Sequence, residues 1–214
     1  MKIIWIIIVI LFCGSCKENI DIDGINFPVR KVGSYIISPW KYVVIHNSGT
    51  MVGNARSFHR YHLGKGWGGL AYHFVISNGK GDTNGKNTAG FRWLKQRYGM
   101  HVKTSQMKYN KHGIGICLVG NFNKTLPTKK QLYSLTYVIV KIMKIYKIPS
   151  KNILGHKEVP YDDSIKRRAS TSCPGKRISI NNYRKICKTL NEKLIDINFS
   201  KKEFNILYQR YVKM

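Results

Sequence analysis

Short apolar runs along the chain predict the strands of a β-sheet. Residues 42–46, 71–77, 113–120 and 153–154 are rich in β-branched and other apolar side chains, and Asn, Ser and Gly follow the first two runs as turn signals. The run 113–120 is almost wholly apolar, which is typical of a strand covered on both faces, so we expect it to be the central strand. Residues 80–112 show no sustained period and are interpreted as a long functional loop region.

Helical patterns separate these runs. Residues 55–63 and 181–190 predict two helices. A longer helix is expected from Pro127 to residue 146, with Thr125 or Thr128 capping its start and apolar side chains recurring every three or four positions. The order strand, helix, strand, strand, helix, strand, helix predicts an α/β fold: a single layered domain with a central mixed β-sheet flanked by helices on its faces.

The N-terminal residues differ from the rest of the chain. Lys2 precedes an apolar run that is shorter than the roughly 20 residues needed to span a bilayer, and Gly14 and Ser15 precede Cys16. We interpret residues 1–16 as a signal peptide of the bacterial lipoprotein type with Cys16 lipidated. The expected location is therefore the cell envelope, anchored to the membrane, and the alternative is a secreted or periplasmic protein with a free Cys16. The remaining boundaries are expected at 17–37 for a tether, 38–190 for the folded domain and 191–214 for a C-terminal extension.

The charge of the chain is strongly positive, with 37 Lys and Arg against 10 Asp and Glu and a formal net charge of +27. Such a charge attracts polyanions through long-range, salt-sensitive forces. An exported protein meets anionic wall polymers and the membrane surface first, so we expect these as partners and no specific nucleic acid. A solvated basic surface without a specific partner is the open alternative.

Three residues suggest a metal site. His46 ends the first apolar strand, His156 follows another strand, and Cys173 lies on the loop after it. Imidazole and thiolate suit zinc, and three protein ligands leave a fourth position for the water that hydrolysis needs. The chain holds seven histidines, so spacing alone leaves a surface or structural role open for each of them.

Five segments resemble the type-2 N-acetylmuramoyl-L-alanine amidases, a family that includes phage lysozyme-type amidases and animal peptidoglycan recognition proteins. They are YVVIHNSGT, YHLGKGWGGLAYHFVISNGKG, HGIGICLVGNF, ILGHKEV and TSCPG, in this order. The resemblance covers about residues 38–190 and implies an amidase catalytic domain. Its expected activity is zinc-dependent hydrolysis of the amide bond between the N-acetylmuramoyl lactyl group and L-alanine of peptidoglycan stem peptides. A non-catalytic module that binds peptidoglycan or muropeptides is the alternative.

The same resemblance implies roles for individual residues. His46, His156 and Cys173 would bind Zn²⁺, and the hydroxyls of Tyr72 and Thr171 would stabilise a developing oxyanion beside it. Residues interpreted as lining a substrate groove, with local packing as the alternative, are Trp67, Arg92, Trp93, His101 and His112.

One departure from the family pattern concerns the spacing of the ligands. Sixteen residues separate His156 from Cys173, more than in compact members of the family. We therefore interpret residues 157–170 as an extended loop, which would weaken the zinc assignment if it displaced Cys173. Thr171 and the Pro174-Gly175 pair keep their places relative to Cys173, which favours the assignment.

Overall fold

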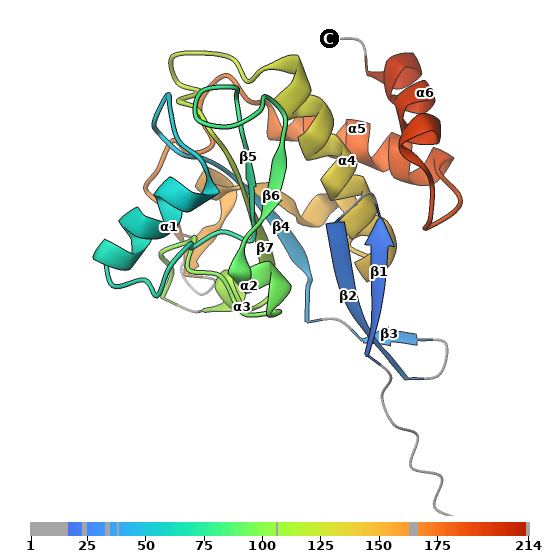
Figure 1. Cartoon of the computed structure of the whole chain (residues 1–214), viewed down its shortest axis with the longest axis horizontal. Helices are drawn as coiled ribbons and strands as arrows, with labels where there is room; N and C mark the ends of the chain where they lie inside the picture. The colour runs from blue at the N-terminus through green and yellow to red at the C-terminus, as the bar shows by residue number, and fades with distance from the viewer. Residues whose placement is uncertain are drawn as a thin grey trace, which may run out of the picture.

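The computed structural model of the chain shows a β-sheet with helices on both sides (Figure 1). It describes residues 17–22, 25–32, 35–37, 39–105, 107–162 and 167–212. The expected signal peptide, including Cys16, lies outside the described residues. Within the described ranges, no helix combines the length and the apolar character needed to cross a membrane.

The central sheet has five strands in the order β6-β5-β7-β4-β8. β4 pairs in parallel with β7 and β8, β5 pairs in parallel with β7, and β6 is antiparallel to β5. The sheet is therefore mixed, as expected, and the almost wholly apolar strand lies at its centre with every residue buried. The strands are β4 (Tyr42–Asn47), β5 (Phe74–Ile76), β6 (Asn87–Ala89), β7 (Gly113–Leu118) and β8 (Ile153–Gly155).

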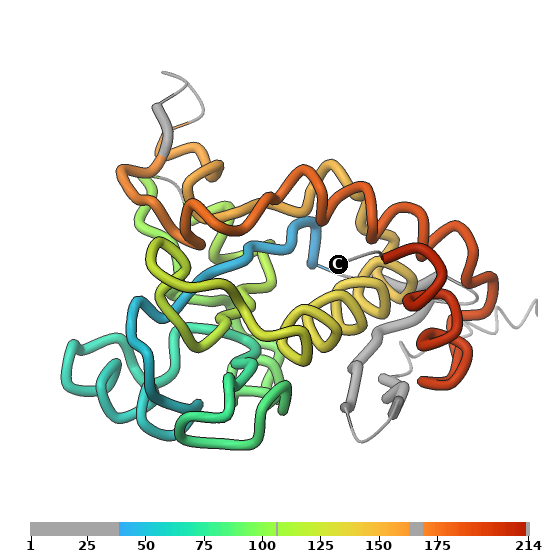
Figure 2. Tube along the Cα trace, turned by 90° about the horizontal axis from the view of Figure 1, so that it is seen from above, coloured from blue at the N-terminus to red at the C-terminus, as the bar shows by residue number. Residues whose placement is uncertain are grey.

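The two faces of the sheet are covered by different helices. α4 (Lys129–Tyr146) and α5 (Ile180–Lys193) pack against each other and cover one face (Figure 2), whereas α1 (Ala55–Gly64) lies on the other side of the sheet in Figure 1. Successive side chains of a strand point to opposite faces. Ile45 packs toward α4 and α5, so His46, the next residue of β4, faces the α1 side.

The long helix begins at a capping box. The Thr128 side chain accepts a hydrogen bond from the Gln131 amide, and the Gln131 side chain accepts one from the Thr128 amide. Gln131 also donates to the carbonyl oxygens of Ile76 and Val119. Thr128 is therefore the cap, and Gln131 fixes the start of the helix to the carboxyl ends of β5 and β7.

The second strand is shorter than the expected 71–77. The backbone amides of Leu70 and Ala71 donate to the side chains of His59 and His62 on α1 rather than to a neighbouring strand. Residues 80–112, which were expected to form a long loop region, also contain more regular structure than expected. β6, α2 (Phe91–Leu94) and α3 (Lys108–Lys111) all lie within them.

Neither end of the described chain is an irregular extension. The expected tether contains β1 (Lys17–Ile22), β2 (Ile25–Val32) and β3 (Tyr35–Ile37), which form an antiparallel sheet in the order β1-β2-β3. Apolar residues alternate with polar ones along Ile25, Asn26 and Phe27 in the manner of a strand.

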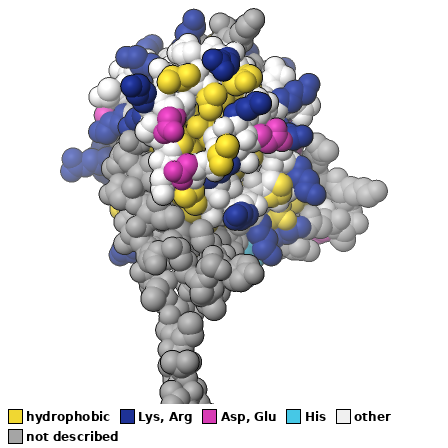
Figure 3. Space-filling model, turned by 90° about the vertical axis from the view of Figure 1, so that its right-hand side faces the viewer, with side chains coloured by type: hydrophobic (Ala, Val, Ile, Leu, Met, Phe, Trp, Pro, Cys, Tyr) yellow, Lys and Arg dark blue, Asp and Glu magenta, His cyan; other side chains and the backbone are white. Residues whose placement is uncertain are grey.

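The C-terminal residues complete the core. Phe204 and Tyr208 of α6 (Lys201–Tyr211) are buried and pack edge-on against Tyr133 of α4. The fully buried Lys141 of α4 donates from Nζ to the carbonyl oxygen of Phe199, just before α6. Exposed hydrophobic side chains lie among Lys, Arg, Asp and Glu side chains on this side of the molecule (Figure 3).

Candidate metal centre

The strand ends bring two of the three expected ligands together. His46 lies near the carboxyl end of β4, and His156 opens the short 3-10 helix η2 (His156–Glu158) directly after β8. β4 and β8 are parallel, with Ile45 beside Gly155, so the two histidines emerge at the same edge of the sheet. Their ring centroids are 4.7 Å apart.

The turn that carries His156 is fixed by an ion pair. The Glu158 carboxylate accepts hydrogen bonds from the Gly155 amide at 2.9 Å and from the Arg184 guanidinium of α5 at 2.6 Å. This ion pair ties the 3-10 turn to α5, which lies on the face of the sheet opposite α1. The tie limits the orientations that the His156 ring can take.

Cys173 completes the group despite the long loop before it. The Asn47 amide donates to Cys173 Sγ at 3.3 Å, the Lys157 amide donates to the Cys173 carbonyl oxygen at 2.7 Å, and the Cys173 amide donates to Thr171 Oγ1 at 3.1 Å. The long loop, residues 157–170, contains strands β9 (Pro160–Asp162) and β10 (Arg167–Arg168), which pair with each other. The cysteine is therefore not displaced.

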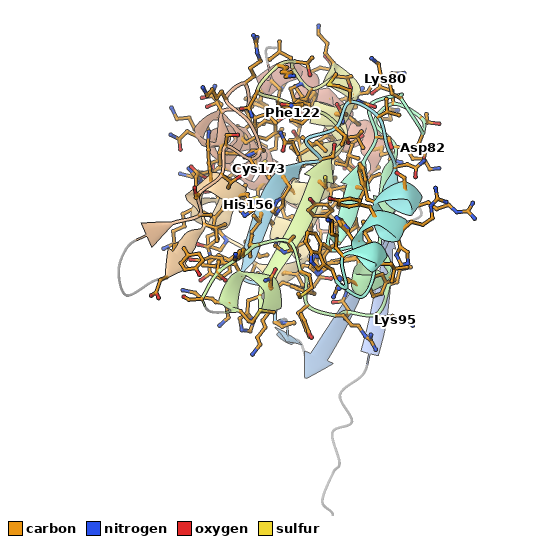
Figure 4. All side chains as sticks on the ribbon, turned by 90° about the vertical axis from the view of Figure 1, so that its left-hand side faces the viewer. Lys80, Asp82, Lys95, Phe122, His156 and Cys173 are labelled. Carbon is orange, nitrogen blue, oxygen red and sulfur yellow. The ribbon has the colours of Figure 1, made fainter. Side chains whose placement is uncertain are left out.

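The donor atoms fit a zinc ion. The ligand atoms of His46, His156 and Cys173 all lie within 4.8 Å of one another, and Cys173 Sγ is 3.7 Å from His46 Nδ1. Zn–N bonds of about 2.0–2.1 Å and a Zn–S bond of about 2.3 Å at a tetrahedral angle place the nitrogen and sulfur about 3.6 Å apart. Figure 4 shows His156 and Cys173 close together beside the sheet.

Burial keeps the imidazoles neutral and the thiol protonated. It lowers the pKa of His46 well below its ordinary value, with smaller contributions from His156 and His101, and lowers the pKa of His156 to about 4. It also lowers the pKa of His101 well below its usual range. Burial raises the pKa of Cys173 to about 12, partly offset by the Asn47 amide and Lys157. The site therefore offers two imidazole lone pairs and a sulfur that would lose its proton to a cation.

Tyr72 lies beside this group, on the α1 side of the sheet. Its ring centroid is 5.2 Å from that of His46. Burial raises the pKa of the Tyr72 hydroxyl well above its ordinary value, and the nearby Cys117 and Cys173 thiols add to the effect. Tyr72 therefore remains a hydrogen-bond donor at neutral pH.

The group opens into a groove. A cavity of about 550 Å³ contains it, and a neighbouring cavity of about 360 Å³ along α1 shares Ser48 and Tyr72 with the first. Thr171 does not line either cavity; its hydroxyl oxygen accepts the bond from the Cys173 amide. The larger cavity is lined by His46, Asn47, Ser48, Gly49, Trp67, Ala71, Tyr72, Met100, His101, Val102, Lys103, Thr104, Met107, Asn110, His156 and Cys173.

Two of the five expected groove residues, Trp67 and His101, border the larger cavity. Trp67 is 41% exposed at the rim and stacks on His62 with 4.9 Å between ring centroids. His101 borders the cavity but is itself buried, and its ring lies behind His46 with the two nitrogens 3.1 Å apart. Trp67 is therefore accessible to a substrate, whereas His101 contacts His46, one of the three expected metal ligands.

The other three are corrected by the structure. Trp93 is fully buried in the core against Phe74, and its position is therefore structural. Arg92 is buried and donates to three carbonyl oxygens, those of Leu70, Tyr98 and Trp67, so it organises the loop under the groove instead of lining it. His112 precedes β7, at the end of the sheet opposite to His46, and its Nδ1 bonds to the Pro39 carbonyl oxygen.

Sequence reasoning missed other residues of the groove, among them Ser48, Lys103 and Asn110. Ser48 lies in the turn directly after His46, which was a usable signal, because a residue next to a strand-end ligand stays near it. Lys103 and Asn110 lie in the region without a period, where no sequence signal distinguishes a groove residue from an exposed one.

The chain is similar to known proteins. The chain matches the N-acetylmuramoyl-L-alanine amidase family over residues 37–176. It is 29% identical to human N-acetylmuramoyl-L-alanine amidase over 57% of this chain and 18% of that protein, and 25% identical to a peptidoglycan recognition protein of Trichoplusia ni over 78% and 84%. The matched region is thus a small part of the human relative.

A solved structure shares the fold. The N-acetylmuramoyl-L-alanine amidase LysC from Clostridium intestinale superimposes with a TM-score of 0.56 and 24% sequence identity, over 69% of this chain and 84% of that one. The family match covers well over half of the residues, including His46, Tyr72, His156 and Cys173. The chain therefore belongs to the N-acetylmuramoyl-L-alanine amidase family.

Proposed function

We propose that this chain is a zinc-dependent hydrolase that cleaves the amide bond between the lactyl group of N-acetylmuramic acid and L-alanine in peptidoglycan stem peptides. The observation that carries the proposal is the convergence of His46, His156 and Cys173 at the floor of an open groove, with donor atoms at zinc-binding separation. Family membership supplies the substrate class.

The residues present suit this chemistry. His46, His156 and Cys173 would hold the ion, which when bound supplies an activated water and polarises the carbonyl group. The Tyr72 hydroxyl, kept protonated by its high pKa, would donate a hydrogen bond to the oxygen on which negative charge develops. Thr171 acts through Cys173, because its hydroxyl oxygen accepts the hydrogen bond from the Cys173 amide.

The groove also suits an anionic peptide. Among the residues that the structure describes, its lining includes Lys103 and no carboxylate. A stem peptide carries free carboxylates, so a basic groove in a strongly basic protein attracts it. Trp67 at the rim offers an aromatic face for a sugar ring.

We further propose that the protein acts outside the cytoplasm, exported by residues 1–16 and anchored through a lipidated Cys16. Anionic wall polymers and the membrane surface would be its other partners there.

The test combines metal content with product analysis. Metal analysis of the purified protein should give one zinc per chain, and mass spectrometry of digested muropeptides should show free stem peptides that begin with L-alanine. Cys173→Ser should lose both properties. Cys187→Ser is the matched control, because it removes a buried thiol from α5, and it should keep both.

The opposite result has a clear meaning. If wild-type protein without zinc binds peptidoglycan and releases no stem peptide even after zinc is added, the chain is a binding module and the enzyme proposal is wrong.

A further inference from the structure

His101 forms a buried hydrogen-bonded chain with His46. His101 Nδ1 lies 3.1 Å from His46 Nε2, and His101 Nε2 lies 3.1 Å from the carbonyl oxygen of Gly113. Both rings are buried, and the angle between their planes is 77°. His101 therefore connects a proposed zinc ligand to the backbone at the start of the central strand.

The partners of His101 determine which nitrogen of His46 carries the hydrogen. A carbonyl oxygen only accepts hydrogen bonds, so His101 Nε2 must donate to Gly113. A neutral imidazole has a single N–H, so His101 Nδ1 is an acceptor. His46 Nε2 must then be the donor to His101, which leaves the lone pair of His46 on Nδ1. That atom is the one that lies 3.7 Å from Cys173 Sγ.

The fold builds a specific slot for the His101 ring. A Cβ at Gly115 would come within 2.5 Å of His101 Cδ2, and one at Gly99 would also collide with the ring. The backbone of the same loop is fixed by the buried side chain of Asn110, whose Oδ1 accepts from the His101 amide at 2.9 Å and whose Nδ2 donates to the Val102 carbonyl oxygen at 2.8 Å. The two glycines therefore leave room for the ring, and Asn110 fixes the backbone on either side of it.

We propose that His101 is a positioning residue of the metal centre: it accepts a hydrogen bond from His46 and so fixes the tautomer and the ring orientation in which His46 offers Nδ1 to the zinc ion. This inference rests on the proposed zinc site. Groups that hydrogen-bond the second nitrogen of a histidine ligand typically change metal affinity 10-fold to 100-fold when they are removed. His101 thus acts on the reaction through His46 without touching substrate.

The test uses two substitutions of equal shape. In His101→Asn, the side-chain oxygen takes the place of Nδ1 and can still accept from His46, whereas His101→Leu has the same shape without an acceptor. Both lose the bond to Gly113 and leave a similar cavity. Zinc affinity, measured by competition with a chelator, should fall about 10-fold to 100-fold in the Leu variant and only a few-fold in the Asn variant.

A second measurement needs no variant. Proton–nitrogen correlation NMR of the metal-free wild-type protein at pH 7.5 should show the His46 ring protonated at Nε2. A ring protonated at Nδ1, or equal zinc affinities for folded Leu and Asn variants, would overturn the inference. Wild-type protein that binds no zinc would instead contradict the proposed function, while the NMR result would still decide the tautomer.

Discussion

The backbone amide of Lys157 donates to the carbonyl oxygen of Cys173 at 2.7 Å, so the two ends of the long loop between the proposed ligands His156 and Cys173 meet beside the candidate metal centre. The ligand geometry is set by this bond and by the Asn47 amide on Cys173 Sγ, and the number of residues in between has little influence on it. An insertion between two ligands is tolerated when its ends are joined in this way, because lengthening a closed loop costs little free energy.

Shortening the loop should therefore leave the metal site intact. Asp162 of β9 pairs with Arg167 of β10, and replacing residues 163–166 by Asn-Gly would join the same strands through a tight turn. We expect one zinc per chain and an unchanged unfolding midpoint, measured by metal analysis and urea titration. Loss of zinc from a variant that still folds would show that the loop itself positions Cys173.

The Tyr72 hydroxyl should contribute to catalysis without contributing to zinc binding. We expect Tyr72→Phe to lower kcat by about 100-fold to 1000-fold, the usual effect of removing one donor to an oxyanion, and to keep the zinc. The measurement is the initial rate of stem-peptide release together with metal analysis. Tyr98→Phe, which removes a hydroxyl from an exposed side chain away from the groove, should retain wild-type rates.

The C-terminal helix should be required for stability. Phe204 is fully buried against Tyr137, Phe199 and Tyr208, so Phe204→Ala should destabilise the fold by about 3–5 kcal/mol in denaturant titrations. Ile206 lies on the same helix but is 54% exposed, and Ile206→Ala should change stability by less than about 0.5 kcal/mol. Equal, small effects would mean that α6 is a dispensable extension.

The central sheet and the positions of His46 and His156 at its edge could be predicted because their signals are local. Each strand that pairs in parallel contains a continuous apolar run, and His46 and His156 directly follow two of these runs, so the parallel pairing of β4 and β8 brings them to one edge. The helix caps likewise depend on residues three positions apart, as in Thr128 and Gln131.

The errors concern side chains whose environment comes from distant residues. Arg92 is buried because the Leu70 and Trp67 carbonyl oxygens, more than twenty positions away, converge on its guanidinium. Trp93 is buried because Phe74 and Tyr146 enclose it. An aromatic or basic residue in a segment without helical or strand periodicity gives no indication of these partners. The same holds for α6, where polar and charged residues surround the apolar positions that meet α4.

Acidification should destabilise the fold through His73. Burial lowers the pKa of His73 to about 4, against 6.5 for the ordinary group, and its ring accepts from the Gly115 amide while bonding to the Arg97 carbonyl oxygen. Between pH 6.5 and 4 the unfolded chain binds a proton that the folded chain excludes, so stability present above pH 6.5 is lost as the pH falls, by up to about 3 kcal/mol. Urea titrations of metal-free protein at pH 7.5 and 4.5 measure this loss. His73→Asn retains an acceptor for Gly115 but does not titrate, so it should be less stable at pH 7.5 and lose less on acidification; an equal loss in both proteins would assign the effect to other groups.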